Sequence, residues 1–356
     1  MSDTAERAAD VTGPPPGGGA SAGNGLWRTL RHGGGVFLRQ REATVFVVVV
    51  ALFLFFTVDS PNFVTHANLA NLLSGVAAPY IILAIGEVLL LICGEIDLSV
   101  GYVVTMAPFL MYFLITYNGV PVILAIIISL IFGLAVGWVN GFLVVTLGLP
   151  SFIATLGTAF VLYGLVLTTS HGEPVNIPPS AEHIGKFFGN ETTSAWGWSA
   201  FIWAAALVVI FHIVLTRTRW GLHTVSVGGN LLGAREAGIS VSRIKYGNFM
   251  ITATLGAFVG LQVAFQVNTI DPSAGGFNAM FYAVTAAVIG GTAMLGGSGT
   301  VLGAFLGALV LALLIDGFDL IGISANVVNM IFGVAVLAAM VANVQLARLR
   351  GAGRVS

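Results

Sequence analysis

The sequence predicts an all-α protein, a polytopic bundle of about ten transmembrane helices. Of the 356 residues, 57% are hydrophobic and only 8% are charged, whereas soluble domains carry about 25% charged residues. Apolar runs long enough to cross or nearly cross a bilayer recur along the chain. They lie near residues 43–58, 76–93, 98–117, 121–147, 152–169, 198–216, 246–266, 282–295, 301–315 and 327–345. This composition favours a multi-pass protein of the cell membrane and argues against a soluble enzyme.

Basic residues orient these spans. If the N-terminus is cytoplasmic and the spans alternate, the cytoplasmic side receives every Lys and Arg except Lys186. Such an excess is typical of cytoplasmic loops, so we expect both termini in the cytoplasm. The expected parts are an N-terminal tail at 1–42, a membrane domain at 43–347 with an outer loop at 170–197 and an inner loop at 217–245, and a C-terminal tail at 348–356.

The inner loop contains a short helix signal. Asn230 suits an N-cap, and Gly238 suits the left-handed position after a helix. A two-turn helix, about 10 Å long, fits between them and needs a surface to dock against. Leucines and alanines give it an apolar side, and Arg235 and Glu236 give it a charged side. The segment is either a peg presented to a soluble partner or an ordinary solvated loop.

Carboxylates near the second and third spans are the second candidate feature. Glu87 lies within an apolar span, and an intramembrane carboxylate is a functional candidate by default. Asp97 and Ser99 follow between two glycines, where they indicate either a broken helix beside a transport path or a simple cap for the third span.

Sites for catalysis and for tightly bound cofactors are not indicated. The Gly-rich run 290–300 contains no lysine, so it is not a phosphate-binding loop and the chain cannot hydrolyse ATP itself. His171 and His183 lack the spacing of metal ligands. The single Cys93 excludes an internal disulfide. Repeated small-xxx-small glycines, such as Gly133, Gly137 and Gly141, predict close helix packing.

Several motifs together resemble one transporter family. They are Glu95 to Gly101, Asn140-Gly141, the run 149–157, the run 228–239, and the Gly-rich run followed by Val301-Leu302-Gly303. In this order they resemble the permeases of ribose/xylose-type ABC importers of monosaccharides. The resemblance spans about Pro61 to Ala342.

The resemblance implies a set of partners. They are a cytoplasmic ABC ATPase that uses ATP and Mg, a second permease copy or paralogue, a periplasmic or lipid-anchored sugar-binding protein, a small carbohydrate and membrane lipid, but no nucleic acid. It implies that a coupling helix enters the ATPase, with the candidate residues Asn230, Leu231, Ala234, Arg235, Glu236, Ala237 and Gly238. Candidate residues of the translocation pathway are Glu87, Asp97, Ser99, Asn140, Phe281 and Tyr282.

The chain departs from the family's sequence pattern at one place, and one alternative function stays open. Family members often carry an acidic stretch where this chain has Met280 to Val284, so the sugar is not identified. The aromatic pair there faces either the pathway or the membrane interface. The alternative function is an ion-coupled secondary transporter that uses Glu87, Glu95 and Asp97 as proton carriers, which leaves the capped helix in the inner loop unexplained.

Overall fold

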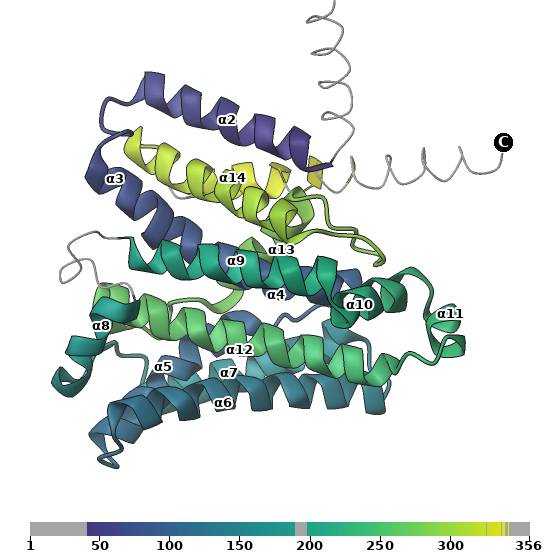
Figure 1. The fold of residues 1–356 in the computed structure, drawn as a ribbon. Coiled ribbons are helices and arrows are strands. Elements are labelled where there is room, and N and C mark those ends of the chain that lie inside the picture. The colour runs from purple at the N-terminus through teal and green to yellow at the C-terminus, as the bar shows by residue number, and fades with distance from the viewer. Residues whose placement is uncertain (1–40, 189–197, 325, 336, 339–340, 342–356) are drawn as a thin grey trace, which may run out of the picture. The chain divides into compact units, whose positions relative to one another are not determined.

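The computed structural model describes residues 41–188, 198–324, 326–335, 337, 338 and 341. The predicted tails at 1–42 and 348–356 therefore lie almost entirely outside the described residues. The described part is helical apart from two short strands, β1 (Val175–Asn176) and β2 (Thr269–Ile270), which pair antiparallel. The prediction of an all-α bundle is confirmed (Figure 1).

The ten predicted spans correspond to ten apolar helical stretches. Among the described residues, seven are long and apolar enough to cross a membrane, and three are shorter. In chain order they are α2 (Arg41–Asp59), α3 (His66–Ala70) with η1 (Asn71–Ala77) and α4 (Ala78–Ile92), α5 (Val100–Thr116), α6 (Val122–Gly141) with η2 (Phe142–Thr146), α7 (Ser151–Ser170), α9 (Ser199–Arg217), α12 (Val241–Val267), α13 (Gly276–Ile289), α14 (Val301–Leu320) and a helix at Asn326–Ala335. Shorter elements outside the spans are η3 (Pro179–Ala181), α8 (Glu182–Phe188), α10 (Arg219–Gly229) and α11 (Leu231–Glu236).

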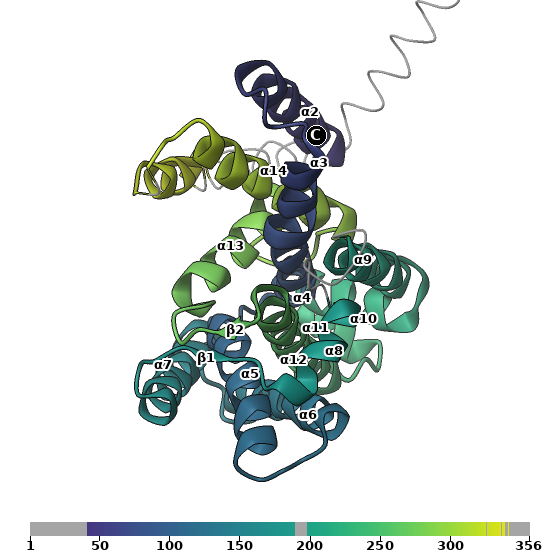
Figure 2. The ribbon, with the colours of Figure 1, turned by 90° about the vertical axis from the view of Figure 1, so that its left-hand side faces the viewer.

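Helix α4 is the centre of the bundle. Every residue of α4 except Tyr80 is buried, and α9, α12, α13 and α14 pack around it (Figure 2). A helix that is apolar on all sides must be surrounded by protein or lipid, and here the neighbouring helices cover it. By contrast, α2, α6, α7 and α9 expose many large apolar side chains, as expected for helices that face lipid.

Glycines permit a close crossing between α6 and α12. Gly133, Gly137 and Gly141 of α6 lie directly against α12, and the two helices run side by side in Figure 1. A Cβ at Gly137 would lie 2.4 Å from the carbonyl oxygen of Phe249. The small-xxx-small prediction is thus confirmed at this crossing, because only glycine permits this backbone approach.

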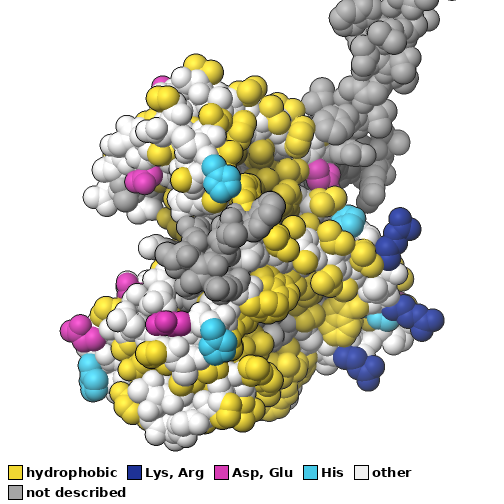
Figure 3. All heavy atoms as spheres, turned by 60° about the vertical axis from the view of Figure 1, so that its left-hand side comes forward, with side chains coloured by type: hydrophobic (Ala, Val, Ile, Leu, Met, Phe, Trp, Pro, Cys, Tyr) yellow, Lys and Arg dark blue, Asp and Glu magenta, His cyan; other side chains and the backbone are white. Residues whose placement is uncertain are grey.

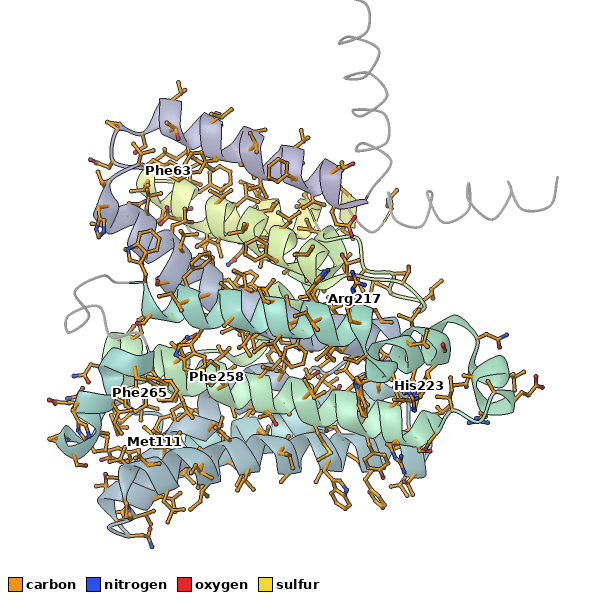
Figure 4. All side chains as sticks on the ribbon, viewed as in Figure 1. Phe63, Met111, Arg217, His223, Phe258 and Phe265 are labelled. Atoms are coloured by element: carbon orange, nitrogen blue, oxygen red, sulfur yellow. The ribbon has the colours of Figure 1, made fainter. Side chains whose placement is uncertain are left out.

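The two ends of the bundle differ in charge and structure. At one end the two strands and α8 meet an aromatic layer in which Phe188 stacks on Phe265 and contacts Phe258 (Figure 4). At the other end lie α10 and α11, and the exposed Arg217, Arg219, Arg235 and Arg243 gather there (Figure 3). This segregation is typical of an inner and an outer face. We refer below to the α10–α11 end as the inner end; its cytoplasmic location stays a prediction.

Replacement of Gly137 by Ala tests the α6–α12 crossing. The added methyl group must push the two backbones apart, so we expect a loss of about 1–3 kcal/mol in stability. Thermal unfolding of the purified protein in detergent measures the loss. The matched control is Gly164→Ala, because a Cβ at Gly164 meets nothing within 4 Å and Ala favours a helix. Equal melting temperatures for the two variants would contradict the packing described here.

Candidate functional site

The short helix predicted in the inner loop is present as α11. Asn230 has an extended backbone, and its side-chain Oδ1 accepts a hydrogen bond of 2.9 Å from the backbone N–H of Gly233. At the other end Gly238 has φ +77°. There the N–H of Gly238 bonds to the carbonyl of Arg235, and the N–H of Ile239 to that of Ala234. Both caps therefore form as predicted, and the C-terminal one is a Schellman motif.

The apolar residues of α11 do not share one docked side. Ala234 is buried against Cys93, Val227, Val241 and Ile244. Leu231 and Leu232, however, are 38% and 69% exposed, so the apolar residues of the helix are divided between the buried Ala234 and the exposed leucines. A helix of six residues offers one narrow buried face, and the small Ala234 occupies it. The leucines are left at the surface together with Arg235 and Glu236.

The residues that directly precede α11 pack against the inner end of α4. The last four carbonyls of a helix need partners from outside it. In α4 those of Leu90 and Leu91 accept the N–H groups of Glu95 and Gly94. The carbonyl of Ile92 accepts the N–H of Gly297 at 2.8 Å. Gly228 lies so close to this carbonyl that a Cβ there would be 1.6 Å from its oxygen.

The remaining carbonyl, that of Leu89, is bonded by a residue that sequence reasoning missed. Asn248 of α12 is fully buried, and its Nδ2 donates to Leu89 at 3.2 Å and lies 3.4 Å from Thr224 of α10. Its Oδ1 accepts from the indole N–H of Trp220 at 2.9 Å. One side chain thus joins α4, α10 and α12. The sequence does not single out Asn248, because the same span also contains Gln262 and Gln266.

An ion pair adds a second connection at the same end. Lys245 near the start of α12 pairs with Glu95, which lies in the loop between α4 and α5. The two side chains are 17% and 10% exposed, so solvent screens their attraction less than it would at an open surface. The Asn248 amide therefore holds α4 itself to α12, and the ion pair holds the loop after α4 to α12.

The structure brings three of the predicted pathway residues together. The Oδ1 of Asp97 accepts the backbone N–H of Ser99 at 2.8 Å and its hydroxyl at 2.6 Å. The Nδ2 of Asn140 donates to Ser99 at 2.8 Å and lies 3.2 Å from Asp97. All three side chains are fully buried. Burial raises the pKa of the Asp97 carboxyl, and the hydrogen bonds from Ser99 and Asn140 oppose that shift.

This cluster links the loop before α5 to α6 and α7. Besides Asn140 of α6, Thr155 of α7 accepts the N–H of Leu98 at 3.0 Å. Asp97, and not the Ser99 hydroxyl, bonds to the N–H groups at the start of α5. The capping interpretation is therefore supported for Asp97, while a role in transport stays a prediction.

Glu87 of α4 lies next to this cluster, close enough to Asp97 for the two carboxyl groups to interact. It is fully buried, and neither carboxylate oxygen has a well-formed hydrogen bond to the described residues, although the backbone N–H of Asp97 lies nearby. An isolated buried carboxylate is costly, which distinguishes Glu87 from the satisfied Asp97.

The two adjacent aromatic side chains of α13, Phe281 and Tyr282, point in different directions. Phe281 is 59% exposed. Tyr282 turns toward the bundle, where its ring lies 5.1 Å from that of Tyr80 and 5.3 Å from that of Phe332, and its hydroxyl lies 3.0 Å from Asn329. Of the two rings, Phe281 is the one that is largely exposed on the single chain, and Tyr282 is partly covered.

Comparison with known proteins identifies the family. A family model described as "Branched-chain amino acid transport system / permease component" matches residues 68–340. The xylose/arabinose import permease protein of Sulfolobus acidocaldarius is 33% identical over 283 residues, which cover 77% of each chain. Autoinducer 2 import system permease proteins of Salmonella typhi and Escherichia coli O9:H4 are 31% and 32% identical and cover 76% of this chain. No solved structure matches. The chain therefore belongs to this permease family, and it is a multi-pass membrane protein.

Proposed function

We propose that the chain is the membrane permease of an ATP-binding cassette importer for a small carbohydrate. A separate cytoplasmic ATPase drives it, and an extracytoplasmic binding protein delivers the substrate. The observation that carries the proposal is α11, a capped helix of six residues that projects from the inner end (Figure 1). The relatives named as xylose/arabinose and autoinducer 2 import permeases support this class, and a pentose is the substrate that the first relative suggests.

The surface of α11 suits a protein partner. Leu231 and Leu232 are exposed beside Arg235 and Glu236. An apolar patch that is rimmed by polar or charged residues is typical of a protein interaction site. The helix is also held at both ends by its caps, so little ordering is required when a partner binds.

The contacts of α11 suit the transmission of movement. Ala234 belongs to one buried apolar cluster with Cys93, which follows α4, and with Val241 and Ile244 of α12. A partner that shifts α11 therefore presses on the two helices that Asn248 joins. Because packed helices move as rigid bodies, a displacement at the inner end reaches the centre of the bundle.

The substrate path is proposed at a surface between two permease copies. Glu87, Asp97, Ser99 and Asn140 are fully buried within one chain, so we assign the last three to holding α5, α6 and α7 together. Phe281 is exposed on the short helix α13, where an aromatic ring can pack against the apolar face of a sugar.

The ion-coupled alternative rests on one observation, the unsatisfied carboxylate of Glu87. A proton carrier of this kind would place a titratable group inside the membrane domain. It leaves the exposed α11 without a role, so we favour the importer.

Substitution at Leu232 tests the coupling surface. Leu232→Glu places a charge in the proposed apolar contact, so we expect the ATPase to dissociate during purification and ATP-driven sugar uptake to be lost. Leu232→Met is the matched control and should keep both. Glu236→Arg, which reverses an exposed charge on the same helix, should also uncouple uptake. Normal uptake by both charge variants would refute the assignment of α11.

A charge exchange tests the ion pair. Lys245→Glu sets two carboxylates against each other, and Glu95→Lys sets two ammonium groups together, so each single variant should lower stability by about 1–2 kcal/mol and reduce uptake. The double variant restores opposite charges and should recover most of both losses. Thermal unfolding and uptake are measured for all four proteins. Additive losses in the double variant would show that the pair does not act.

Substitution at Glu87 separates the two functions. Glu87→Gln keeps the shape and removes the titratable proton, so we expect ATP-driven uptake to continue and the protein to be at least as stable, because an isolated buried charge is no longer possible. Uptake is measured in liposomes with the ATPase and binding protein, with and without a proton gradient. Transport that requires the gradient and disappears in this variant would establish the ion-coupled carrier instead.

A further inference from the structure

The Gly-rich run 290–300 has no role in the function proposed above, yet it exposes the most accessible apolar side chain of the described structure. Leu295 is 94% exposed, a larger fraction than for any other large hydrophobic residue in the described ranges, and Met294 beside it is 39% exposed. Two adjacent exposed apolar side chains form a small patch, and apolar patches that are rimmed by polar residues occur at interaction sites.

The tip of this loop is held in a defined turn. The N–H of Gly296 bonds to the carbonyl of Ala293 at 3.1 Å, and the N–H of Ala293 bonds to the carbonyl of Ser298 at 2.9 Å. Gly296 and Gly297 have φ of +87° and +79°, a backbone that other residues rarely adopt. Met294 and Leu295 therefore stand at the apex of a closed turn.

The turn is joined to the base of α11. The N–H of Gly297 donates to the carbonyl of Ile92, and a Cβ on Gly297 would lie 2.9 Å from the Cα of Gly229. Gly229 directly precedes Asn230, the N-cap of α11. Figure 1 shows the loop between α13 and α14 reaching toward α10. Leu295 is thus two residues from a direct backbone contact with the coupling segment.

We propose that the turn 293–298 is a second contact with the cytoplasmic ATPase, with Leu295 as its apolar anchor. This inference rests on the proposed function, because it extends the surface of α11. Helix α11 and the turn 293–298 contribute differently to the contact with the ATPase. A single short helix fixes one point of contact, whereas a second rigid point fixes the orientation of the partner as well. The link to Ile92 also connects this second point to the end of α4.

Cysteine accessibility tests the proposal in the complete complex. The native Cys93 is buried, so introduced cysteines report with little background. Leu295→Cys and Leu232→Cys should react quickly with a soluble maleimide in the purified permease, and both reactions should be lost when the ATPase is bound. Leu147→Cys is the matched control. Leu147 is a 56% exposed leucine at the α6–α7 turn, and we expect it to react equally in both states.

The outcomes separate this inference from the function on which it rests. If Leu232→Cys is protected and Leu295→Cys still reacts, the second contact is refuted and the role of α11 stands. If neither is protected although the ATPase is bound, both assignments fail. If Leu295→Cys is already unreactive in liposomes without the ATPase, the tip inserts into the membrane and the inference is overturned.

A functional variant gives an independent measurement. Leu295→Glu alters an exposed apex, so the melting temperature should stay that of the unmodified protein while bound ATPase and sugar uptake fall. Leu295→Met should retain both. Full uptake and full ATPase retention by Leu295→Glu would overturn the proposal.

Discussion

The inner end of α4 imposes the constraint on which the rest of the structure depends. This helix is buried on all sides, so its last carbonyls cannot be left to water and must find donors from protein. Two of them accept from the loop that directly follows, at Gly94 and Glu95. The other two accept from distant parts of the chain, Asn248 of α12 and Gly297 of the Gly-rich turn. The hydrogen bonds to the last carbonyls of α4 thereby bring segments that are far apart in sequence together at the inner end of the bundle.

This arrangement explains why a surface helix as short as α11 is ordered. Six residues cannot form a stable helix alone, but its two neighbours in sequence are fixed. Gly228 and Gly229 pack against Ile92 and Gly297 on one side, and α12 begins with Val241 and Ile244 in the same apolar cluster on the other. The caps at Asn230 and Gly238 then need to fix fewer than two helical turns between them. The projecting helix α11 is therefore ordered because the segments on both sides of it are fixed to the buried end of α4.

The sequence was sufficient for features set by local chemistry and by hydropathy. The spans follow from apolar runs, and the caps of α11 follow from Asn230 and Gly238, because a side-chain oxygen and a left-handed glycine act on their nearest neighbours. The direction in which each side chain of α11 points could not be predicted in the same way. The sequence could not show that Leu232 faces solvent while Ala234 is buried, since both suit an apolar face. Nor could it select Asn248, because its value lies in three partners on two other helices, α4 and α10.

The stretch from α3 through α4 connects the two faces of the protein. It comprises His66–Ile92, 27 residues, or about 40 Å of helix. Its outer part is the π-helical η1, where Asn71 bonds to Asp316 of α14, and Asn68 of α3 bonds to the same carboxylate. A π-helical turn departs from the regular hydrogen-bond ladder and often marks a functional position. The inner part is regular and fixed by four separate donors. The stretch therefore joins the inner end, which four separate donors hold, to an irregular segment at the opposite end of the bundle.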